Sequence, residues 1–356
     1  MKIKNTLLLL LVFSFSCASV FSQQGKVDPT FNTYDDGLLG DGFDNTVRTL
    51  SVQDDGKLIV GGDFLNFNGV ATPYLCRLLP DGSKDASFFL GTGFNNKVYT
   101  SLLQPDGKIL VAGSFTQFNG TAVGRLVRLN PDGSRDSSFT ASPGATNSII
   151  YNMVLQSDGS IFLVGSFTSF NGTAANRIVK ILPNGAVDTS FVTGSGASGL
   201  IEKIALQSDG KIIIGGGFEE FNGSTVGKIA RLNADGTLDA SFITGVGFDN
   251  NVSAIGIQSD GKIILGGSFT TFNGTAANRI LRINTDGTVD ASFASGTGFN
   301  SGAVETIKMN SSGAFMLGGS FSGTYNGLAV NRVQLFLPDG AINTAFDIGN
   351  GPASAT

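Results

Sequence analysis

The sequence predicts an all-β protein, a six-bladed β-propeller of four-stranded antiparallel blades. Three observations predict it: a block of about 51 residues that recurs six times, two hairpin-turn signals within each block, and short apolar runs between the turns. Regular spacing of this kind indicates repeated supersecondary units, each of which buries its apolar face on the next. The glycine of the first turn recurs as Gly56, Gly107, Gly159, Gly210, Gly261 and Gly313.

Each block carries two hairpin turns. In the second block, residues 104–108 read Gln-Pro-Asp-Gly-Lys and residues 130–133 read Asn-Pro-Asp-Gly. An Asp followed by Gly is typical of a type I turn that ends in a left-handed residue, which gives a three-residue hairpin loop with a bulge. Each turn therefore predicts an antiparallel strand on both of its sides.

Four strand patterns surround these turns. In the fifth block, Ile255 and Ile257 alternate with other residues before the first turn, and residues 263–265 form a continuous apolar run after it. Alternation is typical of a half-buried strand, and a continuous run is typical of a strand covered on both faces. Residues 280–283 and 290–293 supply the third and fourth strands. Four antiparallel strands per block describe propeller blades, whereas a parallel β-helix would not need two tight hairpins in every repeat.

The repeats divide the chain after residue 22 into one domain, 23–356. The six blocks span 47–97, 98–149, 150–200, 201–251, 252–303 and 304–350. The fourth-strand element occurs a seventh time, because residues 28–31 read Asp-Pro-Thr-Phe. We expect residues 28–31 to close the ring as the outer strand of the last blade, which leaves residues 343–346 as a surplus strand. A seven-bladed or incomplete propeller is the alternative, but no seventh set of inner strands is encoded.

Residues 1–22 have the pattern of a secretory signal peptide. Lys2 and Lys4 precede an apolar stretch at 7–13, and small residues precede a cleavage point after about Ser22. The stretch is too short for a stable membrane span, so we expect no transmembrane segment in the mature chain. Cys17 matches a lipoprotein cleavage box poorly, so lipid anchoring is not expected. The sequence predicts a secreted or cell-surface protein.

Composition excludes several kinds of chemistry. The chain has no His, which excludes Ser-His-Asp and Cys-His catalysis, and no phosphate-loop or dinucleotide motif, so we expect no cofactor. Without the two leader lysines, 21 basic residues face 28 acidic ones, a balance that argues against nucleic acid as a partner. With 29 Phe and no Trp, phenylalanine is expected to fill the core. Cys76, the one thiol of the mature chain, is expected to be buried and inert.

Register across the second turn predicts a cross-strand ion pair. A three-residue loop at 131–133 sets Asn130 against Ser134 and therefore Arg128 against Asp136. Such a pair contributes about 0.2–1 kcal/mol and helps to hold register. The same offset pairs Arg77 with Asp85, Lys180 with Asp188, Arg231 with Asp239 and Arg282 with Asp290. In the sixth block both charges are absent together, and Leu335 and Asn343 occupy the two positions.

Three groups of residues are candidate sites, and each has a simpler structural explanation. Asn130, Asp132 and Asp136 offer oxygen ligands for calcium, but the full calcium-loop pattern is missing and a plain hairpin turn explains them. Glu219 and Glu220 form a carboxylate pair in one block only. The third group is an Asn before Gly in every block, which could bind a glycan or a protein or could close a loop by a left-handed turn. These residues are Asn68, Asn119, Asn171, Asn222, Asn273 and Asn326.

The repeated string resembles the delta-60 repeat family, bacterial secreted β-propellers of unknown function. The string is Gln-x-Asp-Gly-Lys, an apolar run, Gly-x-Phe, Phe-Asn-Gly, Arg-Leu-Asn-x-Asp-Gly and Asp-x-Ser-Phe, and it covers about residues 28–350. Paired glycines such as Gly61 and Gly62 also imitate Kelch repeats, but Kelch blades need a Trp that this chain lacks. We expect these glycines to let strands approach closely near the axis. The resemblance implies export from a bacterium and carries over no catalytic residue.

Because the blocks are so similar, we expect an exported, non-catalytic protein that serves as an interaction, adhesion or structural module. We expect it to be a monomer and its partner to be an unknown protein or polysaccharide. A catalytic site usually breaks the symmetry of a repeat. The alternative is a carbohydrate-active enzyme on a propeller scaffold, which would need two or more carboxylates from different blades in one cleft. Asp and Glu residues outside the repeat pattern that converge at the mouth of the central channel would favour the enzyme.

Overall fold

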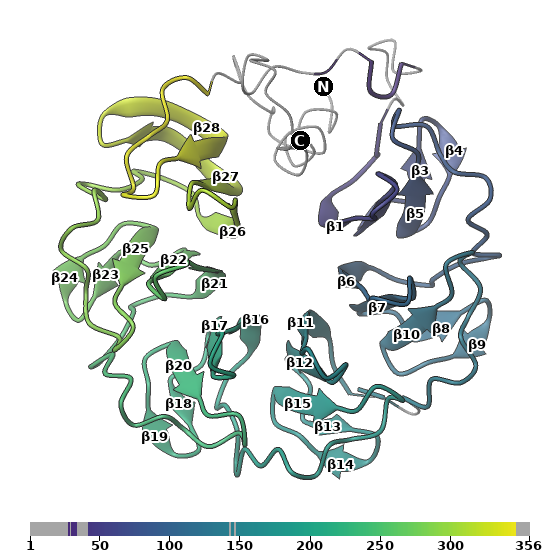
Figure 1. Cartoon of the computed structure of the whole chain (residues 1–356), viewed down its shortest axis with the longest axis horizontal. Helices are drawn as coiled ribbons and strands as arrows, with labels where there is room; N and C mark the ends of the chain where they lie inside the picture. The colour runs from purple at the N-terminus through teal and green to yellow at the C-terminus, as the bar shows by residue number, and fades with distance from the viewer. Residues whose placement is uncertain (1–27, 29, 34–41, 142–143, 146, 347–356) are drawn as a thin grey trace.

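Repeated antiparallel sheets follow one another around a common centre and form an open ring, with a gap between the last sheet and the first (Figure 1). The computed structural model describes residues 28, 30–33, 42–141, 144–145 and 147–346. These residues contain six three-stranded sheets, which we number as units 1 to 6 from the N-terminus. The described part of the chain contains no helix, and hence none long and apolar enough to cross a membrane. Residues 1–22, which we predicted to be a signal peptide, lie outside the described residues, and Cys17 is among them.

Strand order is the same in every unit: innermost, central, third. The innermost strands are β1 (Val47–Val52), β6 (Val98–Leu103), β11 (Ile150–Leu155), β16 (Ile201–Leu206), β21 (Val252–Ile257) and β26 (Val304–Met309). The central strands are β2 (Leu58–Gly62), β7 (Ile109–Gly113), β12 (Ile161–Gly165), β17 (Ile212–Gly216), β22 (Ile263–Gly267) and β27 (Phe315–Tyr325). The third strands are β5 (Leu75–Leu78), β10 (Leu126–Leu129), β15 (Ile178–Ile181), β20 (Ile229–Leu232), β25 (Ile280–Ile283) and β28 (Leu328–Phe336).

Between its central and third strands, each unit makes a short hairpin that turns at the Asn-Gly pair. In units 1 to 5 the hairpin is a separate two-stranded sheet, and in unit 6 it joins β27 to β28. The five separate hairpins are β3 (Asn66–Phe67) with β4 (Val70–Ala71), β8 (Gln117–Phe118) with β9 (Thr121–Ala122), β13 (Ser169–Phe170) with β14 (Thr173–Ala174), β18 (Glu220–Phe221) with β19 (Ser224–Thr225), and β23 (Thr271–Phe272) with β24 (Thr275–Ala276).

Both predicted turns are confirmed. In unit 2 the Gly107 N–H donates to the Gln104 carbonyl at 2.9 Å, and the Gln104 N–H donates to the Lys108 carbonyl at 2.9 Å. Gly107 has a φ of 79°, the left-handed conformation that the loop requires. In the second turn the Asn130 N–H donates to the Ser134 carbonyl at 2.8 Å, which is the predicted register.

The predicted fourth strand is wrong in extent. After the second turn each unit makes only a single bridge, such as Leu129 with Arg135, and one further bond from the Asp136 N–H to the Arg128 carbonyl at 2.9 Å. The Asp-x-Ser-Phe residues then form a turn, because the Asp carboxylate binds the Ser N–H two residues later. We call this turn and the residue after it the latch of a unit.

Each latch fastens its unit to the next one. In unit 1 the buried Phe88 packs in the core shared with unit 2, and the Phe89 N–H donates to the Asp132 carbonyl in the second turn of unit 2 at 2.9 Å. The same bond recurs between the latches of units 2 to 5 and the units that follow: Thr140 to Asn184, Val192 to Asp235, Ile243 to Asp286 and Ala294 to Asp339.

Residues 28 and 30–33 take this latch position on unit 1 and do not form a strand. Residues 30–33 form a turn, Phe31 packs against the core of unit 1, and the Asn32 N–H donates to the Asp81 carbonyl at 2.7 Å. Unit 6 uses its own chain instead, because the Asn343 N–H donates to the Leu335 carbonyl at 2.9 Å. The Asp28 carboxylate accepts the Thr30 N–H at 2.8 Å, which favours a turn here over the strand that we expected.

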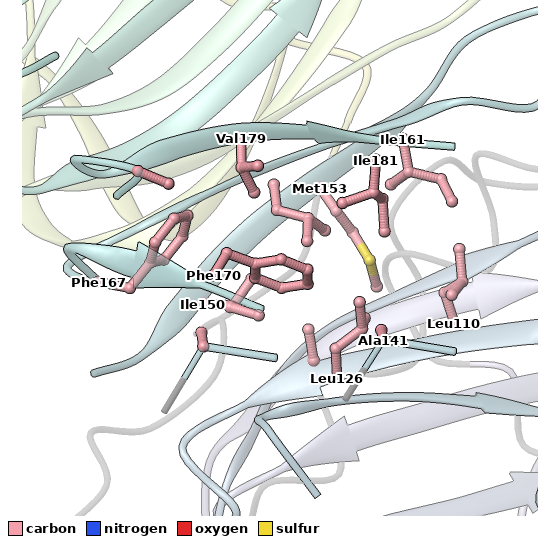
Figure 2. Close-up of a cluster of buried hydrophobic side chains, with 14 of the residues drawn as sticks. Leu110, Leu126, Ala141, Ile150, Met153, Ile161, Phe167, Phe170, Val179 and Ile181 are labelled. Carbon is pink, nitrogen blue, oxygen red and sulfur yellow. The ribbon is translucent and has the colours of Figure 1, made fainter. Parts of the chain in front are cut away.

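The core consists of apolar layers between successive units. Figure 2 shows one layer, in which Leu110 and Leu126 of unit 2 face Ile150, Met153 and other side chains of unit 3. Phenylalanine fills these layers as predicted, and the six phenylalanines at one position that recurs in every unit are completely buried. They are Phe64, Phe115, Phe167, Phe218, Phe269 and Phe321.

The paired glycines allow a close approach of strands. A Cβ on Gly61 would lie 2.6 Å from Val98 of the next unit, and one on Gly62 would lie 2.1 Å from the Thr46 carbonyl oxygen. The contact at Gly62 is with backbone that cannot move aside, and glycine recurs at this position in every unit, whereas the position of Gly61 holds Ala112 in unit 2 and Val164 in unit 3. Cys76, in the neighbouring strand, is buried, and burial raises the pKa of its thiol to about 12, as expected of an inert cysteine.

All five predicted ion pairs are present; the four arginine pairs are buried, and the pair of Lys180 with Asp188 is half-buried. Arg128 Nε lies 2.7 Å from Asp136 Oδ2, and the equivalent nitrogen–oxygen distances in the other four pairs are 2.7–3.2 Å. Burial alone would raise the pKa of Asp136, but hydrogen bonds from Ser138, Lys108 and Arg128 hold that pKa well below its usual range. Each pair is therefore ionised at neutral pH.

The arginine of the pair also binds the next unit, which the sequence did not indicate. Arg128 Nη1 donates to the Pro183 carbonyl of unit 3 at 2.6 Å, and Arg282 Nη1 donates to the Pro338 carbonyl of unit 6 at 2.6 Å. Arg77 and Arg231 make the same bond to Pro131 and Thr285. The guanidinium of Arg128 lies 4.5 Å from the centre of the Phe139 ring of its own latch. Each arginine thus joins its own latch and the following turn.

This second role explains why unit 6 loses both charges. Leu335 replaces the arginine and packs with Met316, Val333 and the latch residue Phe346 in a small apolar cluster. Unit 6 is the last sheet of the described chain, so the arginine's acceptor in a following turn has no counterpart among the described residues. End repeats of solenoid-like arrays commonly differ from internal ones in this way.

We predict that Arg128→Leu destabilises the protein by about 2–4 kcal/mol, because it leaves a buried carboxylate without its closest partner. Adding Asp136→Asn reproduces the Leu335 and Asn343 pair of unit 6 and should restore part of the loss. The unrecovered part measures the bond to Pro183. Urea unfolding of both variants checks this, with the exposed Arg135→Gln as a control expected to change stability by less than about 0.5 kcal/mol. A double variant less stable than Arg128→Leu would contradict the account.

Candidate functional site

Every innermost strand contains a β-bulge at its second residue. In each unit the pairing with the central strand skips one residue, as between Val47 and Thr49, which pair with Gly62 and Gly61. Bulges re-aim a side chain and are common next to functional sites. The six skipped residues, which we call the bulge residues, are Arg48, Tyr99, Tyr151, Glu202, Ser253 and Glu305.

The bulge residues differ chemically although their surroundings repeat. The residue before each one is Val or Ile, and the paired strand ends in a small residue at the same register in every unit. The bulge position itself holds an arginine, two tyrosines, two glutamates and a serine. The fold therefore does not require one particular side chain at this position.

At the first two units, the bulge residue Arg48 belongs to a three-residue ion cluster. Arg48 binds both carboxylate oxygens of Asp63, with its Nη2 at 2.7 Å from Oδ2, and Lys97 Nζ of unit 2 binds the same oxygen at 2.8 Å. Burial would raise the pKa of Asp63, but Arg48 and Lys97 outweigh it and lower the pKa. Two cations therefore share one carboxylate.

The two tyrosines continue the cluster along the ring. The Arg48 guanidinium carbon lies 4.5 Å from the centre of the Tyr99 ring, a cation–π distance. Tyr99 in turn meets Tyr151 edge to face, with 5.2 Å between the ring centres. Both rings are partly exposed, and burial with the nearby Tyr99 raises the pKa of the Tyr151 hydroxyl. The pair offers an aromatic surface that is accessible and neutral.

The acidic bulge residues, Glu202 and Glu305, belong to units 4 and 6. Glu202 Oε1 accepts a hydrogen bond from Asn251 Nδ2 of unit 5 at 2.7 Å. Lys203, next to Glu202, is partly buried, and burial lowers the pKa of its ammonium while Glu202 and Glu305 counteract that shift. Glu305 is exposed and interacts electrostatically with Arg48 as well as with Lys203. Together with Asp63, Lys97, Lys203 and Asn251, the bulge residues form what we call the bulge cluster.

Register places the bulge cluster at one face of the ring. The first residues of the innermost strands pair with the last residues of the central strands, so Arg48 and Asp63 lie at the edge of the sheet opposite to both hairpin turns. Since the innermost strands lie nearest the centre of the open ring (Figure 1), the cluster lies around that centre on one face. Three carboxylates outside the repeat pattern, Asp63, Glu202 and Glu305, are therefore on one rim.

The six Asn-Gly asparagines lie elsewhere, in the short hairpins on the outside of the ring. All six have positive φ, between 48° and 51°, which confirms the predicted left-handed turn. Their side-chain oxygens accept backbone N–H groups from the segment that leads into their own unit; Asn119 Oδ1, for example, accepts the Gly93 N–H at 2.9 Å. A binding role for these amides stays a prediction of the sequence.

The calcium candidates have partners within the protein. Asp132 Oδ1 accepts the Ser134 N–H at 2.9 Å, and Asn130 Nδ2 donates to Ser134 Oγ at 2.9 Å. Asp136 is bound by Arg128 and by Lys108, 3.0 Å away. Across the described ranges no group of three His, Cys, Asp or Glu side chains is placed to hold a metal ion. Of the two adjacent glutamates, Glu219 forms an ion pair with Lys228 and Glu220 is exposed.

Sequence reasoning missed the bulge residues because it looked for what the repeats share. Their signal is a position that varies from block to block and directly follows one that is always Val or Ile: Val47, Val98, Ile150, Ile201, Val252 and Val304. Those six apolar residues recur with the spacing of the turn glycines. An alignment of the blocks that asked where a variable residue follows a constant one would have found the column.

Five stretches of the chain match a family model described as a domain of unknown function (DUF5122) β-propeller. The stretches are residues 53–88, 104–139, 156–191, 207–242 and 258–293, each 36 residues long and together 180 of the 356 residues. Each runs from the first turn of a unit to the phenylalanine of its latch. No curated protein matches the sequence.

Solved structures with similar folds include propellers of several kinds. A virginiamycin B lyase from Staphylococcus aureus is 15% identical, with a TM-score of 0.50 over 83% of this chain and 86% of that one. The WD40 β-propeller domain of Doa1 is 14% identical, with a TM-score of 0.48 over 81% and 96%. A gluconolactonase from Xanthomonas campestris is 11% identical, with a TM-score of 0.43 over 79% and 84%. At these identities the similarity of the lyase shows the β-propeller fold and no activity.

We predict that Asn119→Ala lowers the free energy of unfolding more than Asn119→Gly does. Glycine keeps the left-handed turn and loses only the bond to Gly93, at a cost of about 1 kcal/mol, whereas alanine also strains the backbone and costs about 2 kcal/mol. Thermal unfolding of both variants checks this, with Gln117→Ala on the same hairpin as an exposed control. Alanine and glycine variants of equal stability would contradict a structural role for this asparagine.

Proposed function

The chain belongs to the DUF5122 β-propeller family of unknown function, and we propose that it is an exported, non-catalytic module that binds a polysaccharide or a surface protein through the bulge cluster. One observation supports this most: six structurally equivalent positions around the mouth of the ring hold different, partly exposed polar and aromatic side chains. A repeat protein gains specificity for one ligand by varying such positions on a constant scaffold.

The composition of the cluster suits binding. Tyr99 and Tyr151 provide an aromatic surface at low entropic cost, and Arg48, Glu202 and Asn251 provide fixed hydrogen-bonding groups beside it. Concave sites that combine aromatic side chains with a few placed polar groups are typical of ligand binding. We propose six blades for the propeller, supported by the six three-stranded sheets of the described chain, with a seven-bladed ring as the alternative.

A carbohydrate-active enzyme is the second candidate, and one observation favours it. Glu202 and Glu305 lie outside the repeat pattern, come from different units and both interact with Lys203. Two carboxylates at one site are what glycoside hydrolysis needs. Binding remains our preferred proposal because the third carboxylate, Asp63, has a lowered pKa and is held by two cations, which is the opposite of what a general acid requires. Release of sugar from a glycan that Glu202→Gln and Glu305→Gln abolish would favour the enzyme.

We predict that Tyr99→Ala weakens binding to the ligand at least about tenfold, as loss of an aromatic side chain at the centre of an interface commonly does. The mature chain, residues 23–356, is first screened on a glycan array and in pull-down from surface proteins. Affinity of the best ligand is then compared for the native chain, Tyr99→Ala and Phe89→Ala. Phe89 is 76% exposed on the other face of the ring and is the matched aromatic control. Equal losses in the two variants, or none, would contradict the proposed site.

We predict that export removes residues 1–22. Expressed with its leader in a bacterium, the protein should be found outside the cytoplasm with Gln23 at its N-terminus, as read by mass spectrometry of the intact chain. Replacing Lys2 and Lys4 by glutamate should keep the full-length chain inside the cell, because the basic start of the leader is required for targeting. A native chain that stays cytoplasmic and uncleaved would contradict the export proposal.

A further inference from the structure

Charge is distributed unevenly around the bulge cluster. On units 1 and 2, the cations Arg48 and Lys97 share the carboxylate of Asp63, which leaves one positive charge in excess. Two of the five N–H donors of Arg48 bind Asp63, and the Lys97 side chain is 43% exposed, so this part of the cluster retains cationic donors toward solvent. An anionic group of a ligand would be attracted here.

The opposite imbalance occurs on units 4 and 6. Glu202 and Glu305 occupy the bulge positions of units 4 and 6, and Lys203 is the one cation of the cluster on these units, which leaves one negative charge in excess there. Glu305 also interacts electrostatically with Arg48 of unit 1. Glu202 is already bound by Asn251, whereas Glu305 is exposed and forms no ion pair or hydrogen bond within the described residues. A cationic group of a ligand would be attracted to Glu305.

Neutral groups lie between these two ends. The Tyr99 and Tyr151 rings follow Arg48 in ring order, and Asn152, Asn251 and Ser253 add amide and hydroxyl groups on the innermost strands or beside them. Counting Arg48, Lys97 and Lys203 against Asp63, Glu202 and Glu305, the cluster has no net charge. Electrostatic complementarity here therefore favours a ligand that is neutral overall but separates its charges.

We propose, resting on the binding function above, that the ligand of the bulge cluster is a zwitterionic saccharide, one that carries both an acidic group and a free amino group. The acidic group binds at Arg48 and Lys97, the amino group binds at Glu305, and the sugar rings lie over Tyr99 and Tyr151. A singly charged glycan satisfies only one end of the cluster.

A short peptide is also zwitterionic, but the groups between the charged ends fit a saccharide better. Amides, hydroxyls and two phenols match the many hydroxyl groups of a sugar, because each can donate or accept a hydrogen bond. A peptide would instead rely on apolar pockets for its side chains or on an extended strand. Preference for a peptide is therefore an outcome of the test that contradicts the proposal.

The test compares two disaccharides of equal size by titration calorimetry. Both join glucuronate to glucosamine; in one the amine is free, and in the other it is acetylated and uncharged. At a pH of about 6.5, where the free amine is protonated, we expect the zwitterion to bind at least about tenfold tighter than the acetylated form. Glycylglycine serves as the peptide zwitterion and should bind more weakly than the free-amine disaccharide.

Three variants assign the two ends. Glu305→Gln should remove the difference between the disaccharides by weakening only the free-amine form, by about five- to tenfold. Lys97→Gln should weaken both disaccharides, because each carries the carboxylate. Glu220→Gln and Arg135→Gln make the same charge changes on exposed residues outside the cluster and should change neither affinity. Tyr99→Ala should weaken both disaccharides.

The outcomes separate this inference from the binding function on which it rests. Equal affinity for the two disaccharides, an unchanged difference in Glu305→Gln, or tighter binding of glycylglycine overturns the zwitterion proposal. If another glycan then binds in a way that Tyr99→Ala abolishes, the binding function stands and only the ligand class is wrong. If no glycan or surface protein binds at the cluster, both proposals are wrong.

Discussion

The whole architecture depends on one constraint, that no sheet can bury its apolar face without the next. Units 1 to 5 meet it with the same contacts on the unit that follows: the latch phenylalanine, the backbone bond from the residue after it, and in four of these units the arginine that reaches the following turn. Apolar burial supplies most of the stability of such layers, while the polar contacts fix which side chains meet. The turns, the hairpins and the register of the strands all position the residues that contact the following unit.

The bulge residues of the innermost strands are not part of the apolar layers between units, and this leaves room for a site there. Side chains such as Val98 and Ile150 beside the bulges are completely buried between units, whereas the bulge residues lie outside the shared core and are free to vary. A β-bulge inserts one residue without disturbing the pairing on either side. The fold therefore provides six positions around one opening whose side chains can change without loss of the ring.

How much of this could be predicted from the sequence depends on whether a feature repeats. The turns at Gly107 and Gly133, the buried phenylalanines and the pairing of Arg128 with Asp136 follow from local geometry and recur six or five times, so they were predictable. The bond from Arg128 to Pro183 joins residues of different units and has no local signal. The bulge cluster was hidden for a different reason, because Arg48 and Tyr99 meet only once the ring curves.

Each latch binds only the unit that follows it in the chain, so all junctions between units have the same direction. This has a consequence for how genes of such proteins can change. Every internal unit presents the same donor at its end and the same acceptor in its second turn, as Phe89 and Asp132 do between units 1 and 2. Unequal recombination that removes or duplicates a whole internal block therefore leaves every junction chemically matched. The order of bulge residues around the opening would be altered by the same event. Recombination of repeats could thus create a new recognition surface in one step while the packing between units is inherited intact.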